Sequence, residues 1–76
     1  MAKFTIELNG AAERLNDYLE ANDYKVKVGH RNNYTVVDLY KISNDRCIMC
    51  LNSGLTDKQT LEYIYSMIQG ILLTSN

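Results

Sequence analysis

A run of strand-forming residues on both sides of a tight turn, over residues 34–52, most constrains how this chain folds. It reads Tyr-Thr-Val-Val-Asp-Leu-Tyr-Lys-Ile, then Ser-Asn-Asp-Arg, then Cys-Ile-Met-Cys-Leu-Asn. β-Branched and aromatic residues favour extended strands, and Ser, Asn and Asp favour the turn between them. The pattern predicts a β-hairpin with strands over residues 34–42 and 46–52.

Amphipathic helices are predicted on both sides of the strands. Over residues 10–22 the apolar side chains form one stripe and the acidic ones lie opposite, as in a helix with one buried face. A second helix is predicted over residues 57–73, where Thr56 and Gln59 fit a capping box. The core residues expected from the two stripes are Ala11, Ala12, Leu15, Tyr18, Leu19, Leu61, Ile64, Tyr65, Ile68 and Leu72.

Two shorter segments complete the prediction. Residues 24–29 alternate as a strand with Tyr24, Val26 and Val28 inward, and a turn is expected from Gly29 to Asn33. Residues 3–8 also alternate, which favours a strand or extended segment. However, Phe4 and Leu8 continue the spacing of the helix that follows, so a helix stays the alternative there.

The predicted fold is therefore a single small α+β domain over residues 1–76, in the order (β)αβββα. Two amphipathic helices of this size cover one face of a three- or four-stranded antiparallel sheet, giving a two-layer sandwich. A chain of 76 residues buries only about 60% of its unfolded surface, so the core is expected to be thin.

One face of the sheet is expected to stay open. Asp38 in mid-strand costs free energy if it is buried unpaired, so the even-numbered residues of its strand are assigned outward. Thr35, Val37, Leu39 and Lys41 then face the helices. On the next strand, strict alternation assigns Cys47, Met49 and Leu51 to the core, and Arg46, Ile48, Cys50 and Asn52 to the outside.

This open face is the predicted interface, because aromatic residues and Arg are enriched where proteins bind each other. Its predicted members are Lys25, Lys27, Tyr34, Val36, Tyr40, Arg46 and Ile48. An acidic stripe on the first helix, with one tyrosine of the second, is an alternative interface: Glu13, Asp17, Glu20 and Tyr63.

The residue pattern predicts no catalytic, cofactor or metal site. Cys47 and Cys50 form a CxxC, but a spacing of three in a regular strand sends the two thiols to opposite faces, and His30 is the only histidine. Free cysteines are among the most buried residues, which favours a structural role. The four glycines are isolated, so no phosphate-binding loop is present.

The αβββα order resembles that of double-stranded RNA-binding domains, which place a lysine cluster at the start of the last helix. Residues 57–60 of this chain hold one lysine, Lys58. The order, size and near-neutral charge also resemble small phage proteins that block host defence enzymes, including some anti-CRISPR proteins. That resemblance implies a phage- or mobile-element-encoded inhibitor that binds a host protein.

The leading hypothesis is a non-enzymatic, cytoplasmic interaction protein that binds a partner protein or itself, as a homodimer, through the open face. The cytoplasm is expected because no signal-peptide core or membrane-spanning run is present in the sequence. Nucleic-acid or nucleotide binding is the alternative. It is motivated by five basic residues against two acidic ones over residues 25–46, interspersed with tyrosines.

Overall fold

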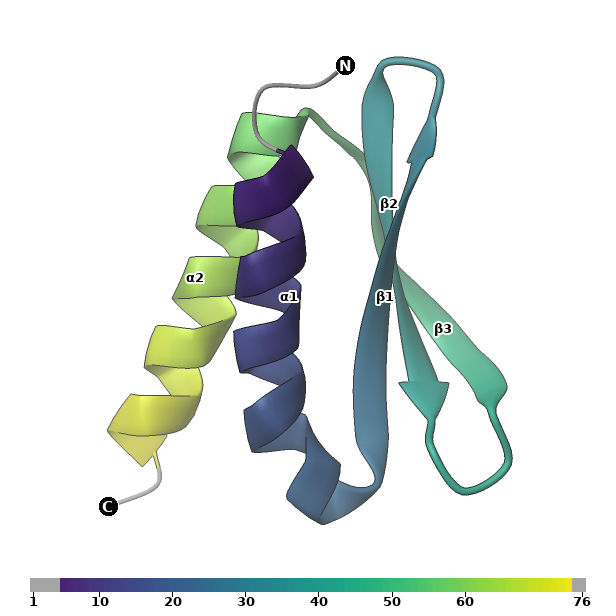
Figure 1. The fold of residues 1–76 in the computed structure, drawn as a ribbon, viewed down its shortest axis with the longest axis vertical. Coiled ribbons are helices and arrows are strands. Elements are labelled where there is room, and N and C mark those ends of the chain that lie inside the picture. Colours follow the sequence, from purple (N-terminus) through teal and green to yellow (C-terminus); the bar gives the residue numbers. More distant parts are fainter. Residues whose placement is uncertain (1–4, 75–76) are drawn as a thin grey trace.

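The computed structural model describes residues 5–74, in which two helices flank a three-stranded antiparallel sheet of strand order β1-β2-β3 (Figure 1). The α+β class and the αβββα order are as predicted. The elements are α1 (Thr5–Leu19), a short 3-10 helix (Glu20–Asn22), β1 (Tyr24–Arg31), β2 (Tyr34–Lys41), β3 (Arg46–Leu55) and α2 (Asp57–Thr74).

The strand or extended segment predicted over residues 3–8 is wrong where the structure describes it, because residues 5–8 are the first turn of α1. Leu8 is buried together with Ala12 and Leu15, so helical spacing, and not strand alternation, places these side chains in the core. Residues 3 and 4 lie outside the described residues. The sheet accordingly has three strands in the described chain.

The turn predicted from Gly29 to Asn33 is too long. β1 continues to Arg31, which pairs with Tyr34, so only two asparagines connect β1 to β2. Asn32 takes a positive φ of 58°, in the left-handed region that asparagine tolerates better than most residues. The hairpin is consequently tighter than the sequence suggested, and His30 belongs to a strand.

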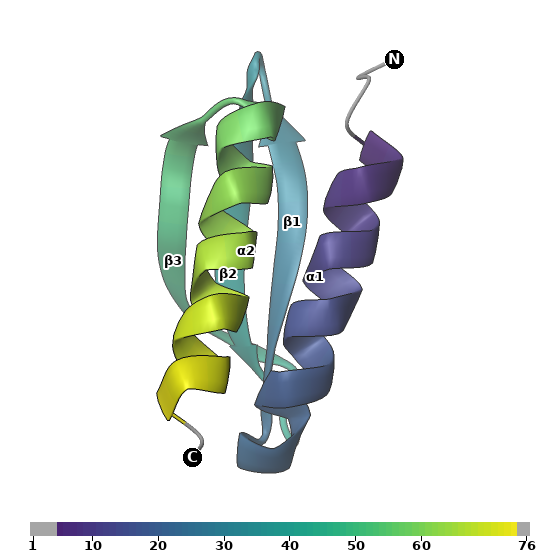
Figure 2. The same ribbon diagram turned by 90° about the vertical axis from the view of Figure 1, so that its left-hand side faces the viewer.

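Both helices lie on the same side of the sheet and run in the same direction, with α1 beside β1 and α2 over the middle of the sheet (Figures 1 and 2). α1 packs closely against α2 and β1. The buried apolar residues form one cluster: Leu8, Ala11, Ala12, Leu15, Val26, Val37, Leu61, Ile64 and Ile68. The central strand contributes Val37, which is completely buried.

Most of the predicted core is confirmed, but three aromatic or aliphatic residues of the helices are exposed. Tyr18, Tyr65 and Leu72 belong to the predicted stripes, yet each exposes more than a third of its surface. Tyr18 and Tyr65 lie beside the narrower buried stripe, and Leu72 lies one turn beyond Ile68, the last buried residue of α2. Two helices on a small sheet therefore bury less than the full width of each apolar face.

The start of α2 is fixed by its own side chains and by β2. The Thr56 N–H donates to Gln59 Oε1 at 3.1 Å and the Gln59 N–H donates to Thr56 Oγ1 at 3.3 Å, which confirms the capping box. One turn later, the buried Thr60 hydroxyl meets the buried Thr35 hydroxyl, which in turn lies 3.2 Å from the carbonyl of Leu55. A chain of donors from Thr60 through Thr35 to Leu55 satisfies all of these polar groups.

The outer edge of β1 is occupied by a side chain of α1. Asn16 Nδ2 donates to the carbonyl oxygen of Val26 at 3.1 Å, and the Val26 N–H donates to Asn16 Oδ1 at 2.7 Å. The amide thus takes the place of a neighbouring strand at this point of the edge. Blocking an edge in this way hinders pairing with another chain.

The other edge strand, β3, is irregular. Between the pairs Lys41–Arg46 and Thr35–Leu55, β3 advances nine residues while β2 advances six. The register shifts lie where Ile48, Leu51 and one of residues 53–54 are inserted relative to β2. Each inserted residue is a bulge that interrupts the ladder and increases the local twist.

The threonine chain yields a stability prediction. Thr35→Val should destabilise the fold by about 1–3 kcal/mol, because it removes the side-chain donor to the Leu55 carbonyl and the oxygen that accepts from the buried Thr60 hydroxyl. Thr60→Val should cost less, because Thr35 still donates to Leu55. Urea unfolding of the single and double variants measures both effects, and strictly additive losses would contradict the proposed donor chain.

Candidate functional site

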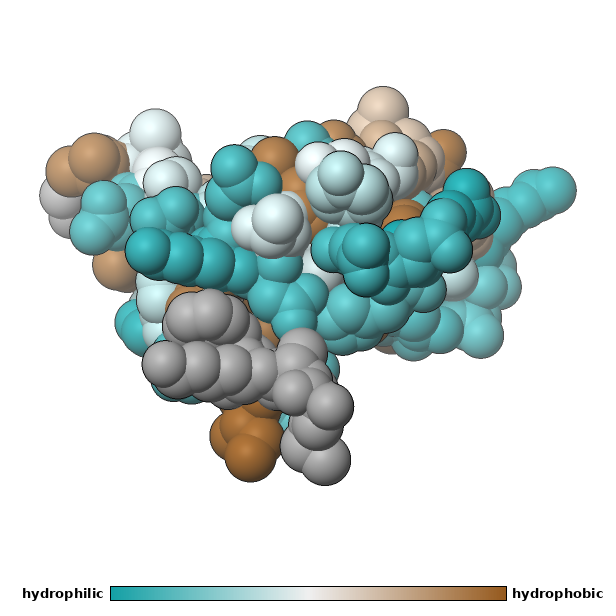
Figure 3. All heavy atoms as spheres, turned by 90° about the horizontal axis from the view of Figure 1, so that it is seen from above, coloured by the Kyte–Doolittle hydropathy of each residue, from teal (hydrophilic) through white to brown (hydrophobic). Residues whose placement is uncertain are grey.

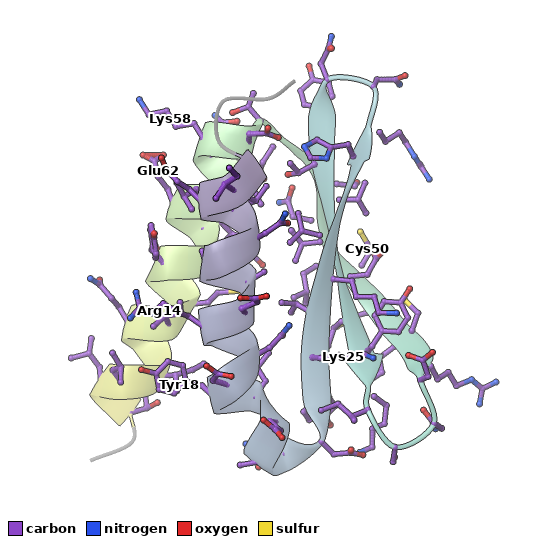
Figure 4. All side chains as sticks on the ribbon, viewed as in Figure 1. Arg14, Tyr18, Lys25, Cys50, Lys58 and Glu62 are labelled. Carbon is purple, nitrogen blue, oxygen red and sulfur yellow. The ribbon has the colours of Figure 1, made fainter. Side chains whose placement is uncertain are left out.

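The sheet face turned away from the helices is the candidate site, and cross-strand pairing defines its members. Lys25 lies opposite Tyr40, Lys27 opposite Asp38, and Gly29 opposite Val36. Residues that face each other across antiparallel strands share a face. Figure 4 shows Lys25 and Cys50 pointing to the side of the sheet away from the helices. The predicted orientation of β2 therefore holds, with Thr35 and Val37 buried on the other side.

The predicted orientation of β3 is wrong at three positions, because the bulges at Ile48 and Leu51 break the alternation. Asn52 was predicted to face outward, but it lies opposite the buried Val37, on the side of the helices. Cys47 lies opposite Tyr40, so it belongs to the open face and not to the core. Arg46 lies opposite Lys41, on the side of the helices, and not on the predicted open face. Cys50, opposite Asp38, is on the open face as expected.

Large apolar residues are exposed in the distal half of the β2–β3 hairpin, beyond the reach of both helices. Ile48 exposes 47% of its surface and Met49 exposes 53%, and Ile42 next to the turn is also exposed. We call Ile42, Ile48 and Met49 the hairpin patch. Met49 was predicted to be in the core; it lies opposite Leu39, but this part of the sheet twists away from the helices (Figure 1).

The basic residues of the open face already have partners within the chain. Lys25 Nζ lies 3.1 Å and Lys27 Nζ 3.7 Å from Asp45 Oδ1 in the β2–β3 turn. Lys27 Nζ also lies over the ring of Tyr40, 4.3 Å from its centre. A hydrogen bond from Lys25 and the charges of both lysines hold the pKa of Asp45 below its ordinary value of 3.8.

Asp23, which caps the 3-10 helix after α1, also holds the β2–β3 turn. Asp23 has a φ of 68°, its carbonyl accepts the Ile42 N–H at 2.9 Å, and its Oδ1 accepts the Ser43 N–H at 3.0 Å. Asp23 Oδ2 lies 3.8 Å from Lys41 Nζ, which sits over the Tyr24 ring. These contacts fix the position of the turn that carries Asp45 and the hairpin patch.

His30 and Asp57 form a pair that the sequence did not reveal. His30 Nε2 lies 2.8 Å from Asp57 Oδ1 and links β1 to the first residue of α2. A carboxylate in the first turn of a helix is favoured by the helix dipole. The hydroxyl of the preceding residue, Thr56, is engaged with Gln59 in the capping box. The pair therefore serves as a surface clamp between two elements.

The other predicted residues lie on the open face toward the β1–β2 turn, or on α1, the 3-10 helix after it and α2. Tyr34 is exposed beside Arg31 at the β1–β2 turn, and Val36 is half-buried. Figure 3, seen from the end that carries that turn, shows a mainly hydrophilic surface with small separate hydrophobic areas. In the alternative interface, Glu13, Asp17 and Glu20 are exposed and Tyr63 is half-buried. No residue of that stripe enters the ion pairs found within residues 5–74.

Within the described part of the chain there is no pocket and no group of three or more His, Cys, Asp or Glu residues arranged to hold a metal ion. Neither helix of that part is long and apolar enough to cross a lipid bilayer. The candidate site is a surface on the sheet.

No protein-family model, curated protein or solved structure compared with this chain matches it.

The ion pairs at the turn predict a pH dependence. Because folding lowers the pKa of Asp45, its stabilising contribution is present above its ordinary pKa and is lost as the pH falls through the lower value of the folded state. NMR titration of the Asp45 carboxyl should give a midpoint below 3.8, and Lys25→Met should raise that midpoint.

Lys58→Met is the matched control, since Lys58 lies in the first turn of α2, at the opposite end from the β2–β3 turn (Figure 4). It removes one lysine charge as Lys25→Met does, but should leave the Asp45 midpoint unchanged. An equal rise in both variants would show that net charge, and not the pairing with Lys25, sets the pKa of Asp45.

Proposed function

We propose that this protein is a non-enzymatic binding module that inhibits or regulates a partner protein through the distal half of the β2–β3 hairpin and the adjoining open face. The hairpin patch is the observation that supports it. Its three large apolar residues are exposed at the same end of the sheet, where neither helix covers them. Exposed apolar groups that gather on one area are typical of interaction sites.

The free energy gained by covering these side chains is modest but sufficient for a small interface. Ile48 and Met49 are half-exposed, so covering each one contributes about 1 kcal/mol. Tyr40, held under Lys27, adds an aromatic surface on the open face of the same hairpin. Aromatic anchors with apolar neighbours are the residues that contribute most of the free energy at protein interfaces.

The attachment of the turn supports the same proposal. Asp45 binds two lysines of β1, and Asp23 binds the backbone at the other end of the turn. A patch on a fixed hairpin loses less conformational entropy on binding than one on a mobile loop. The partner meets a surface that already has its bound shape.

The charge arrangement favours a protein over a nucleic acid. Lys25 and Lys27 share Asp45, and Lys41 is paired with Asp23. The two remaining basic residues of this region lie far apart, Arg31 at the β1–β2 turn and Arg46 at the β2–β3 turn. Phosphate binding needs several free cations along one path, and these residues do not form one.

The size and architecture fit an inhibitor encoded by a phage or mobile element and acting in the cytoplasm of the host. Self-association through the hairpin patch is the homodimeric form of the same proposal, since two-fold dimers are the commonest oligomers.

Substitutions in the hairpin patch test this function. Ile48→Asp and Met49→Asp should each weaken partner capture from host lysate by about tenfold or more, because each places a charge in an apolar contact. Glu13→Lys with Asp17→Lys is the control on the alternative surface and should leave capture intact. Circular dichroism confirms that each variant is folded.

Two further measurements distinguish a protein partner, a nucleic-acid partner and self-association. Capture that survives nuclease supports a protein partner, whereas capture lost with nuclease and with rising salt supports the nucleic-acid alternative. Light scattering after size-exclusion chromatography reports self-association. Unchanged capture and unchanged mass in both hairpin variants would refute the proposed site.

A further inference from the structure

The bulge in β3 brings the two cysteines of the chain to the same face. Cys47 lies opposite Tyr40 and Cys50 lies opposite Asp38, and these two β2 residues both point to the open face. In a regular strand a spacing of three would separate the thiols. The inserted Ile48 makes the spacing equivalent to two, which restores a common side.

The register also sets the spacing of the thiols along the sheet. Their partners on β2 are two residues apart, which corresponds to about 6.6 Å along a strand. Rotation about χ1 turns two such side chains toward each other. Both cysteines are free and exposed, so nothing in the described fold covers them.

We propose that Cys47 and Cys50 form a two-thiolate site for one Cu(I) ion, a property separate from the proposed protein-binding function. Soft thiolate ligands select Cu(I), which accepts two of them. A tetrahedral Zn(II) site needs four ligands, and residues 5–74 contain no group of three or more suitable side chains. On binding, each S–H bond gives up its proton to solvent and two S–Cu bonds form, so two protons are released per ion.

Neighbouring donors do not belong to this site. Met49 lies between the cysteines and carries a soft thioether, but its cross-strand partner is Leu39, on the side of the helices. His30 is held by Asp57 on the far end of β1. The ion would therefore be bound by the two thiolates alone and stay accessible from the solvent.

The experiment is an anaerobic titration of the reduced full chain with Cu(I) in competition with bathocuproine disulfonate. We expect one ion per chain. Cys47→Ser and Cys50→Ser should each weaken Cu(I) binding by about 100-fold or more, because each loses the second, intramolecular ligand. Met49→Leu removes the thioether between the cysteines and should leave the affinity unchanged.

Three results would overturn the site. The first is a Cu(I) affinity in either serine variant that is within a few-fold of the wild type. The second is a loss of affinity in Met49→Leu equal to that in the serine variants, and the third is a complex of one ion per two chains. X-ray absorption of the wild-type complex gives a reading that does not depend on the variants. Two sulfur ligands support the site, and nitrogen or oxygen ligands in their place refute it. Partner capture by the serine variants is measured separately, so this site and the hairpin patch can fail independently.

Discussion

The packing of two helices on a strongly twisted sheet determines most of the structure (Figure 1). The buried cluster is centred on Val37 of the middle strand, with Val26 beside it and both helices above. The twist of the sheet carries the end of the β2–β3 hairpin away from this layer (Figure 1). Twist is inherent to β-strands, so the two helices cannot stay in contact with the strands where the sheet turns away from them.

In a core this small, hydrogen bonds are needed in addition to apolar contacts to attach the helices to the sheet. The Thr35–Thr60 hydroxyl pair joins α2 to β2, and the Asn16 amide joins α1 to the edge of β1. Each pair satisfies groups that would otherwise be buried without a partner, and each fixes one helix to one strand. Specific hydrogen bonds thereby define how the helices sit on the sheet, in addition to the apolar contacts.

The sequence was sufficient to predict those features that depend on a local pattern of residues. The α2 capping box, the inward face of β2 and the apolar stripe of α1 depend on residues within a few positions of each other, and all three are present. The first turn of α1 was missed because residues 3–8 satisfy strand alternation and helical spacing together. Only the packing of Leu8 against the rest of the core favours the helix.

The candidate site was less predictable because its arrangement depends on β3. Alternation assumes one residue per pleat, and the bulge at Ile48 exchanges the faces of Arg46 and Cys47. The contacts of Asp45 with Lys25 and Lys27 connect residues about twenty positions apart, and nothing in either segment indicates the other. Long-range pairing of this kind follows from the register of the strands and is invisible to local patterns.

The same bulge also brings both thiols to the open face, as the proposed copper site requires. A regular edge strand would place its two cysteines on opposite faces and offer its free backbone to any other strand, which promotes indiscriminate association. The bulges in β3 break that ladder, so recognition through this part of the molecule must use side chains. The side chains available are the apolar hairpin patch and the two thiols. They come from the β2–β3 turn and from β3, and the contacts of Asp23 and Asp45 anchor that turn.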